Sequence, residues 1–203
     1  MISSVIMILL FVTSVISSGP RPDSQPRPET ETDIKKVDFL NFTYSSYLCS
    51  QEFGNKGIGK TVRVTKGEFK NKNVYFSVDQ DKVTYGDLNG DGNEEAVVPI
   101  SCGAMGANFS RSEVYIFTLK DGRTTLLGAL NDKSFERDYR RSYPEAESYW
   151  GGTEKGPKVN NGNLEIEVLT DGSHAAPKYI ALLEYHLTGG SFSLISKPQR
   201  KNA

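Results

Sequence analysis

Short segments in which apolar and polar residues alternate limit the fold of this chain more than any other feature. In residues 61–65 and 164–168 every second residue is apolar, the pattern of a strand with one face on a core and the other in water. Further runs of strand-forming composition cover residues 73–78, 114–119, 125–130, 179–187 and 191–195. A helical period is not sustained, although residues 132–139 fit a turn or two of helix. We therefore expect a mostly β fold with little helix.

Turn signals between these runs favour antiparallel pairing. Asp121-Gly122 separates the runs at 114–119 and 125–130, and Gly189-Gly190 separates the last two runs. Dipeptides of this kind supply the positive φ angles that two-residue hairpins need. The sequence predicts an antiparallel sandwich or a barrel-like single domain.

The first residues are typical of an export signal. Residues 5–12 are uninterrupted apolar, and small residues follow through Ser18. This length suits the core of a signal peptide and is too short to span a bilayer. We expect residues 1–18 to be a signal peptide, with an uncleaved membrane anchor as the alternative. The mature chain would then be secreted or periplasmic and would have no transmembrane span.

Composition changes on both sides of the expected domain. Residues 19–36 contain four of the nine prolines among polar residues, which predicts an extended, disordered linker. Residues 37–196 then form the β-rich domain, about 160 residues long, which suits one core. The basic stretch at 197–203 is interpreted as a disordered tail rather than a binding arm.

Cysteine content and charge narrow the class of protein further. Cys49 and Cys102 are the two cysteines, and in an exported chain such a pair predicts one disulfide bond. The alternative is two separately buried thiols. The formal net charge is −1, so no overall field points to a nucleic acid or an anionic membrane as partner.

An oxygen-rich loop at residues 87–95 carries the clearest chemistry. Three acids are spaced so that their side chains can face one point, and Gly92 stands where the chain must turn sharply. Oxygen ligands in loose geometry favour Ca²⁺ over Mg²⁺, and transition metals would call for adjacent His or Cys. The expected ligands are Asp87, Asn89, Asp91, Asn93 through its carbonyl, and Glu95.

The flanks of this loop read as strands, and its twelfth position is Val98 rather than the Glu of an EF-hand. The loop resembles the D-x-[DN]-x-D-G-x-x-[DE] calcium loops of FG-GAP and VCBS repeats, with Glu95 in the last position. Those families repeat the loop, whereas this chain has it once over about a dozen residues. The longer stretch at 85–103 looks like exported bacterial proteins with a single such loop, and this resemblance implies a structural Ca²⁺ and no particular activity. The alternative is a tight hairpin in which the carboxylates only accept backbone amides.

A polar and aromatic stretch at residues 138–158 is predicted to be a long loop. Arg140, Arg141, Tyr149 and Trp150 are residue types that anchor ligands and partners,. We interpret them as a ligand or partner surface. The alternative is that Trp150 closes one end of a sheet while the arginines pair with nearby glutamates.

These patterns favour an exported, non-enzymatic binding domain that is stabilised by one Ca²⁺ and one disulfide. Its partner would be an extracellular or envelope ligand or protein, which the sequence leaves unidentified. The alternatives are a hydrolase or protein inhibitor that uses the loop from Arg140 to Trp150, and a purely structural envelope component. Neither histidine, His174 or His186, has a recognisable nucleophile motif around it, so no catalytic residue is assigned.

Overall fold

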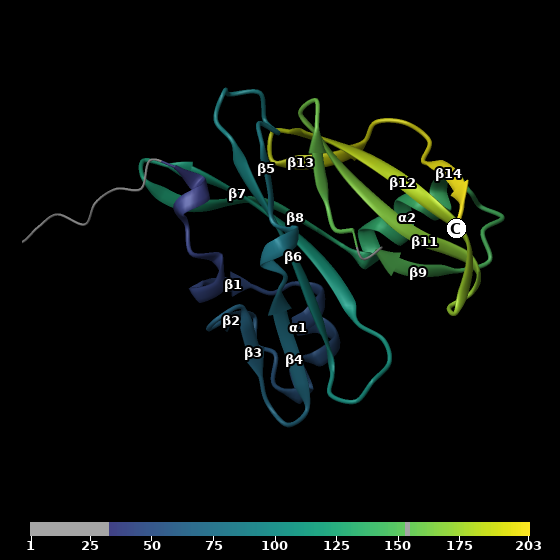
Figure 1. The fold of residues 1–203 in the computed structure, drawn as a ribbon, viewed down its shortest axis with the longest axis horizontal. Helices are drawn as coiled ribbons and strands as arrows, with labels where there is room; N and C mark the ends of the chain where they lie inside the picture. Colours follow the sequence, from purple (N-terminus) through teal and green to yellow (C-terminus); the bar gives the residue numbers. More distant parts are fainter. Residues whose placement is uncertain (1–32, 153–154) are drawn as a thin grey trace, which may run out of the picture.

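The protein folds into two six-stranded antiparallel sheets and one two-stranded sheet (Figure 1). This computed structural model describes residues 33–152 and 155–203. The expected signal peptide and linker residues 19–32 lie outside the described residues. The prediction of a mostly β, antiparallel fold is confirmed.

The first large sheet has the order β3-β4-β6-β7-β8, and β5 pairs with β6 beside this path. Its strands are β3 (Glu68–Lys70), β4 (Val74–Val78), β5 (Thr84–Gly86), β6 (Glu95–Ala104), β7 (Arg111–Lys120) and β8 (Arg123–Asn131). The two-stranded sheet joins β1 (Thr43–Ser45) to β2 (Thr61–Arg63).

The second large sheet is centred on the pair β11–β12, with β10, β9, β13 and β14 added along the edges. Its strands are β9 (Tyr149–Gly152), β10 (Lys158–Asn160), β11 (Asn163–Ser173), β12 (Ala176–Thr188), β13 (Ser191–Leu194) and β14 (Gln199–Asn202). The alternation predicted for 164–168 is confirmed, because Leu164, Ile166 and Val168 are buried.

Strands β6 and β7 are buried on both faces, and this arrangement places the cores. Val98 and Tyr115 belong to a hydrophobic cluster that also contains residues of β1, β2 and α1. Their chain neighbours Val97 and Ile116 belong to a second cluster, shared with β11, β12 and α2. Because neighbouring side chains of a strand point to opposite faces, the first sheet is the middle layer of the molecule.

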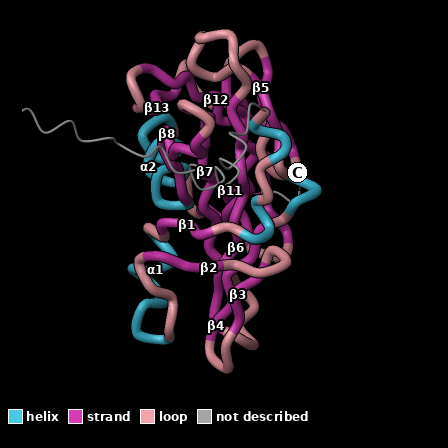
Figure 2. The backbone as a smooth tube through the Cα atoms, turned by 90° about the vertical axis from the view of Figure 1, so that its left-hand side faces the viewer, coloured by secondary structure: helices cyan, strands magenta, loops and turns pink. Residues whose placement is uncertain are grey.

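Helices are short and lie outside the strands (Figure 2). The α-helices are α1 (Leu48–Phe53) and α2 (Asp132–Ser142), and the 3₁₀ turns are η1 (Ile34–Lys36), η2 (Phe39–Asn41), η3 (Gly54–Lys56) and η4 (Gln80–Lys82). Asn131 caps the N-terminus of α2, and its side chain accepts a hydrogen bond from the Ser134 amide. It buries Phe135 and Tyr139, four residues apart on one face, in the second cluster,.

Both predicted hairpins are present. The β7–β8 turn has φ angles of 52° at Asp121 and 68° at Gly122, and the β12–β13 turn has 57° and 80° at Gly189 and Gly190. Positive φ at both central residues matches the right-handed twist of the strands that the turn joins.

Three predicted irregular segments are ordered instead. The prediction of one long loop at 138–158 is wrong. Helix α2 continues to Ser142, and strand β9 begins at Tyr149. Residues 34–36 form η1 rather than linker, since Ile34 is buried in the first cluster. The tail expected at 197–203 contains β14, which pairs with β12.

Candidate functional site

The acidic loop connects β5 to β6 and is held by its own side chains. Asp87 accepts hydrogen bonds from the Gly90 amide on Oδ1, at 2.7 Å, and from the Gly92 amide on Oδ2, at 2.9 Å. Gly92 has φ +86°, a conformation that a residue with a Cβ rarely adopts. The side chain of the first acid is thereby folded inward over the turn.

The middle of the loop continues the same pattern. Asn89 Oδ1 accepts the Asp91 amide, and Asp91 Oδ1 accepts the Asn93 amide, both at 2.8 Å. The hydrogen bond from the Asn93 amide is the largest cause of a lowered pKa at Asp91. Asp91 is therefore ionised at neutral pH.

Glu95, the last acid of the loop, is fully buried. Its carboxylate accepts hydrogen bonds from the Leu88 amide at 2.9 Å and from Asn89 Nδ2 at 3.0 Å. Burial raises the pKa of Glu95, and the charges of Asp91 and Asp87 raise it further. Among the described residues no ion pair reaches Glu95, while its exposed neighbour Glu94 pairs with Lys35. A buried carboxylate beside two other acids, without a cationic partner, is an unfavourable arrangement that a cation would relieve.

The donor set fits a hard cation, although the geometry is that of a capped turn. In the described part of the chain no group of three or more His, Cys, Asp or Glu side chains is arranged to hold a metal ion. The carboxylates accept backbone amides, as the hairpin interpretation expects. A carboxylate has about four lone-pair sites, so each acid keeps acceptor capacity beyond these bonds. The oxygens of Asp87, Asp91 and Glu95 suit Ca²⁺ in chemical type.

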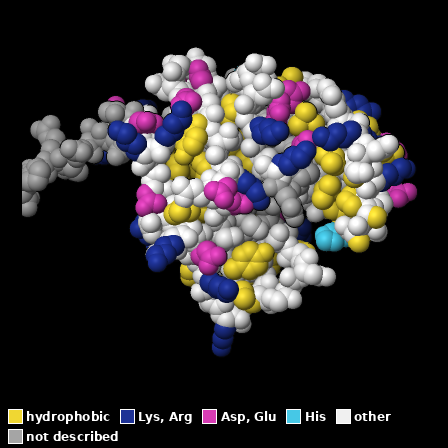
Figure 3. Space-filling view, in the orientation of Figure 1, with side chains coloured by type: hydrophobic (Ala, Val, Ile, Leu, Met, Phe, Trp, Pro, Cys, Tyr) yellow, Lys and Arg dark blue, Asp and Glu magenta, His cyan; other side chains and the backbone are white. Residues whose placement is uncertain are grey.

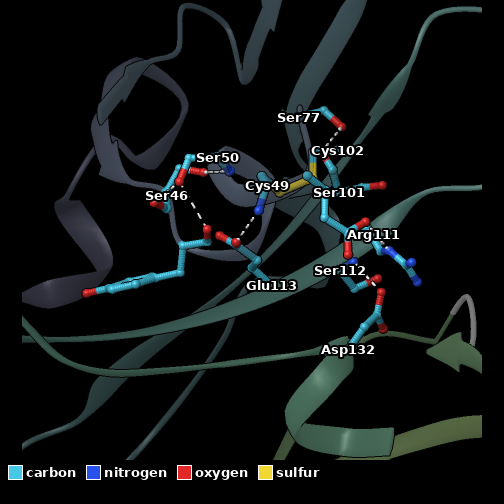
Figure 4. The surroundings of a disulfide bond; sticks show 12 residues. Ser46, Cys49, Ser50, Ser77, Ser101, Cys102, Arg111, Ser112, Glu113 and Asp132 are labelled. Carbon is cyan, nitrogen blue, oxygen red and sulfur yellow. Dashed lines mark hydrogen bonds and ion pairs between the residues drawn. A yellow bond between two sulfur atoms is a disulfide. The ribbon is translucent and has the colours of Figure 1, made fainter. Parts of the chain in front are cut away.

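The predicted disulfide between Cys49 and Cys102 is present and joins α1 to β6 (Figure 4). Glu113 lies beside it on β7 and accepts the Cys49 amide on Oε1 at 2.7 Å. Tyr115 donates its hydroxyl proton to the other oxygen of Glu113. This buried acid therefore ties the cysteine-bearing helix to the middle sheet.

A cleft of about 590 Å³ lies where four segments that are distant in sequence meet. These segments are the β6–β7 loop, the start of α2, strand β9 and the β11–β12 turn. Its lining includes the side chains of Phe109, Arg111, Asp132, Tyr149, Trp150 and His174. The volume is within the range of sites that bind a small ligand.

Two exposed aromatic side chains flank this cleft. Phe109 is 50% exposed and Trp150 is 37% exposed. The ring of His174 contacts that of Trp150 edge-on, with centroids 5.5 Å apart. The Arg111 guanidinium lies 5.5 Å from the Phe109 ring centroid and is paired through Nε with Glu52 at 2.6 Å.

The polar floor of the cleft is buried. Asp132 is 4% exposed, and its carboxylate accepts the Ser112 amide at 2.7 Å and the Tyr149 hydroxyl at 3.1 Å. Figure 4 shows Asp132 pointing toward Ser112, next to Arg111. Burial raises the pKa of Asp132 above its ordinary value. These hydrogen bonds join the start of α2 to β7 and to β9.

The structure divides the surface predicted from the sequence. Tyr149 and Trp150 line the cleft. Arg140 instead pairs with Glu136 at 2.8 Å and donates to the Ala146 carbonyl at 2.9 Å, so it braces the end of α2. Arg141 lies 3.8 Å from an oxygen of Asp138. Within the described residues neither arginine belongs to the cleft.

Sequence reasoning missed Phe109, Arg111, Asp132 and His174 as parts of this site. They are separated along the chain and carry no shared motif. Phe109 sits in an Asn-Phe-Ser tripeptide, which signals glycosylation at most. Only the tertiary contacts bring these residues together.

No protein-family model, curated protein or solved structure matches this chain. In residues 33–152 and 155–203 no helix combines the length and the apolar character needed to cross a membrane.

Proposed function

We propose that this chain is an exported, non-enzymatic binding domain whose ligand site is the cleft at Trp150. One observation carries the proposal: two large aromatic side chains from different segments, Phe109 and Trp150, stand exposed at the same cleft. Exposed aromatic side chains beside buried polar groups are typical anchors of ligands and partners. The N-terminal signal pattern and the disulfide support export to an oxidising compartment.

Trp150 is the chain's only tryptophan, so its fluorescence reports on this cleft alone. We would titrate the protein with soluble cell-wall fragments, namely chitohexaose, cellohexaose and stem peptides of peptidoglycan. A ligand in the cleft is expected to shift or quench the emission, and Phe109→Ala should weaken binding roughly tenfold or more.

Ile195→Ala is the matched control, because Ile195 is similarly exposed, at 48%, and does not line the cleft. The proposal is rejected if ligands bind equally well to wild type and to Phe109→Ala and Trp150→Ala, as measured by calorimetry. Unchanged melting temperatures of the variants would show that only the surface was altered.

We further propose that the acidic loop binds one structural Ca²⁺ through Asp87, Asn89, Asp91, Glu95 and the Asn93 carbonyl. The support is the buried carboxylate of Glu95, which has no cationic partner among the described residues and whose pKa is raised by burial and by the neighbouring charges of Asp91 and Asp87. A bound Ca²⁺ would neutralise these charges and hold the turn between β5 and β6. Exported modules of this type bind Ca²⁺ at about 10⁻⁴–10⁻³ M.

The test of the calcium proposal is a thermal melt in about 5 mM Ca²⁺ and in chelator. We expect a higher melting temperature with Ca²⁺ for the wild type and no difference for Asp91→Ala. Identical melts of the wild type in both buffers would reject a structural metal.

A hydrolase is the second candidate function, and Asp132 is the observation that favours it. A buried acid with a raised pKa in a cleft is a property of acid–base catalysts,. Asp132→Asn separates the two functions, since it would abolish turnover of a saccharide or peptide substrate but leave the Trp150 signal of binding in place.

A further inference from the structure

The C-terminal segment, residues 197–203, lies along the edge of β12. Its strand β14 pairs with residues 179–182, from Tyr179↔Asn202 to Leu182↔Gln199, and Figure 1 shows it beside the end of the chain. Pro198 is buried and the Arg200 side chain is only 18% exposed. The other side chains of the segment face solvent. Pro198 and Arg200 are thus its least exposed side chains, Lys197 Nζ lies 4.1 Å from the Tyr143 ring centroid, and a short ladder pairs its backbone with β12.

The Arg200 guanidinium lies among three tyrosine rings, which we name the tyrosine cage. The rings are those of Tyr139 and Tyr143 from the α2 region and Tyr179 from β12. The guanidinium carbon lies 3.4 Å from the ring centroid of Tyr143 and 5.1 Å from those of Tyr139 and Tyr179. A planar guanidinium stacks on aromatic faces better than the ammonium of lysine does. The position of Arg200, in contact with all three rings, therefore favours arginine over lysine.

Acids and a hydroxyl complete the recognition of a basic strand. Arg200 Nη2 lies 3.5 Å from Asp171 Oδ2, and Arg200 Nη1 lies 3.5 Å from Glu145 Oε1. Lys201 pairs with Glu167 at 2.8 Å. Tyr143 donates its hydroxyl to the Pro198 carbonyl at 2.6 Å. Charge, backbone and aromatic contacts all match an extended basic peptide.

The cage is built without Arg200. Asp171 accepts the Tyr139 hydroxyl at 2.8 Å and the Glu147 amide at 2.6 Å, and it holds φ +55°, a conformation that Asp tolerates better than most residues. Tyr139 is itself buried in the second hydrophobic cluster. Tyr139 and Asp171 are therefore held by hydrogen bonds that do not involve the segment, and the Tyr143 ring packs 5.3 Å from that of Tyr139.

The segment itself is fitted less well than the cage. Arg200 Nε and Nη2 are buried without a hydrogen-bond partner, and the 3.5 Å contact to Asp171 is longer than a good charged hydrogen bond,. Over the described residues, neither hydrophobic cluster includes a residue after Leu194. Removal of the segment would leave both cores intact and would expose the backbone groups of β12.

We propose that the tyrosine cage and the adjoining edge of β12 are a receptor for an extended, arginine-anchored basic peptide. The chain's own C-terminal segment occupies this receptor, and a basic segment of a partner protein takes its place by adding a strand to β12. The tethered segment competes at an effective concentration of about millimolar. A partner peptide therefore binds only if its affinity or its concentration is high enough to displace the segment. The receptor is separate from the cleft at Trp150.

The experiment uses the full chain with Arg200→Ala, in which the anchor is removed but the cage is kept. The probe is a fluorescein-labelled peptide with the sequence of residues 195–203, followed by fluorescence anisotropy. We expect Arg200→Ala to bind the peptide at least roughly tenfold more tightly than wild type, because the internal competitor is weakened. A peptide in which the arginine is replaced by alanine should bind to neither protein.

Tyr143 supplies matched variants in the Arg200→Ala background. Tyr143→Ala should abolish peptide binding, whereas Tyr143→Phe keeps the ring and should retain most of it. The proposal is overturned if folded Arg200→Ala fails to bind the peptide, or binds the arginine and alanine peptides equally.

Hydrogen exchange of the wild type gives a second readout that needs no variant. The ladder amides of β14 should exchange at least roughly tenfold faster than those of β11 and β12, because the segment opens locally. Exchange of β14 only through global unfolding would overturn the proposal even if Arg200→Ala proved too unstable to study.

Discussion

At the scale of single residues, buried acids decide the local structure. Glu95 shapes the acidic loop, Glu113 holds the disulfide-bearing helix, and Asp132 joins β9 to α2. Each accepts backbone amides or a hydroxyl, which lowers the cost of burial. They differ in their surroundings, because Glu95 alone of the three stands next to the other acids of the loop.

Glu95→Gln should change stability in opposite directions with and without Ca²⁺. In chelator, the amide removes a buried negative charge and should stabilise the fold by about 1 kcal/mol. In saturating Ca²⁺, the lost ligand should destabilise it by a similar amount. Urea unfolding in the two buffers measures this, with Glu94→Gln as a control that should change little in either. The same sign in both buffers would contradict a metal at Glu95.

Glu113→Ala should cost about 2–4 kcal/mol of unfolding free energy, because it leaves the buried Cys49 amide and Tyr115 hydroxyl without their acceptor,. The exposed ion pair of Glu136 with Arg140 provides the control, and Glu136→Ala should cost less than about 0.5 kcal/mol. Chemical unfolding of both variants would test the difference. Equal losses would mean that Glu113 has no special role.

At the scale of elements, alternation located the strands well because each core strand must bury one face. The strands around 73–78, 114–119, 164–168 and 179–187 are present, with bounds one or more residues wider or narrower. Short elements were not predicted. The elements α1, β9, β10 and β14 have too few residues for a local period and gain their stability from tertiary partners,. Helix α2 extends beyond its predicted end because its last turn is braced by Arg140.

The docking of β14 should weaken in acid. The pKa of Glu167 is lowered, chiefly by its hydrogen bond with Lys201. Burial opposes the ionisation of Asp171, but hydrogen bonds led by that of Tyr139 lower its pKa as well. A lowered pKa means stability that is present above the ordinary carboxyl pKa and lost as pH falls through the folded value.

Glu167→Gln tests this pH dependence. The melting temperature of wild type should exceed that of Glu167→Gln at pH 6–7, and the difference should vanish as the pH falls below about 4. Glu165→Gln, on the same face of β11, is the control. A difference that persisted unchanged in acid would show that the ion pairs of Glu167 with Lys201 and Lys155 do not stabilise the fold.

At the scale of the whole molecule, the middle sheet serves two cores and the disulfide secures the outer layer. Figure 3 shows Lys and Arg interspersed with Asp and Glu on this face, in keeping with the net charge of −1. The disulfide closes a separation of 53 residues between α1 and β6. This bond links the N-terminal layer covalently to the sheet on which it packs.

Removal of the disulfide should therefore destabilise the whole molecule. The chain-entropy relation for a loop of this length gives about 4 kcal/mol. The double variant Cys49→Ala/Cys102→Ala should show that loss in urea unfolding, with an unchanged strand signal by circular dichroism. Reducing agent should lower the unfolding free energy of the wild type to that of the double variant, and it should leave the double variant's value unchanged. A loss under about 1 kcal/mol would mean that the N-terminal layer is held by packing alone.

The candidate sites were only partly visible in the sequence. The acidic loop is a local motif, so its residues could be named in advance, although calcium binding there stays a proposal. Trp150 and Tyr149 stood out by residue type. Phe109 and His174 reach the same cleft from other strands' ends, and no spacing along the chain encodes that meeting.

What the sequence by itself determined is whatever depends on near neighbours: the strand faces, the Asp-Gly and Gly-Gly hairpins, the acidic turn and the pairing of two lone cysteines. What only the tertiary structure decided is whatever depends on distant ones: the two cores on either side of β6 and β7, the cleft at Trp150, and the docking of Arg200 among three tyrosines. The physical reason is that alternation and turn geometry act within a few residues, whereas the free energy of packing is shared among side chains that the chain order leaves far apart.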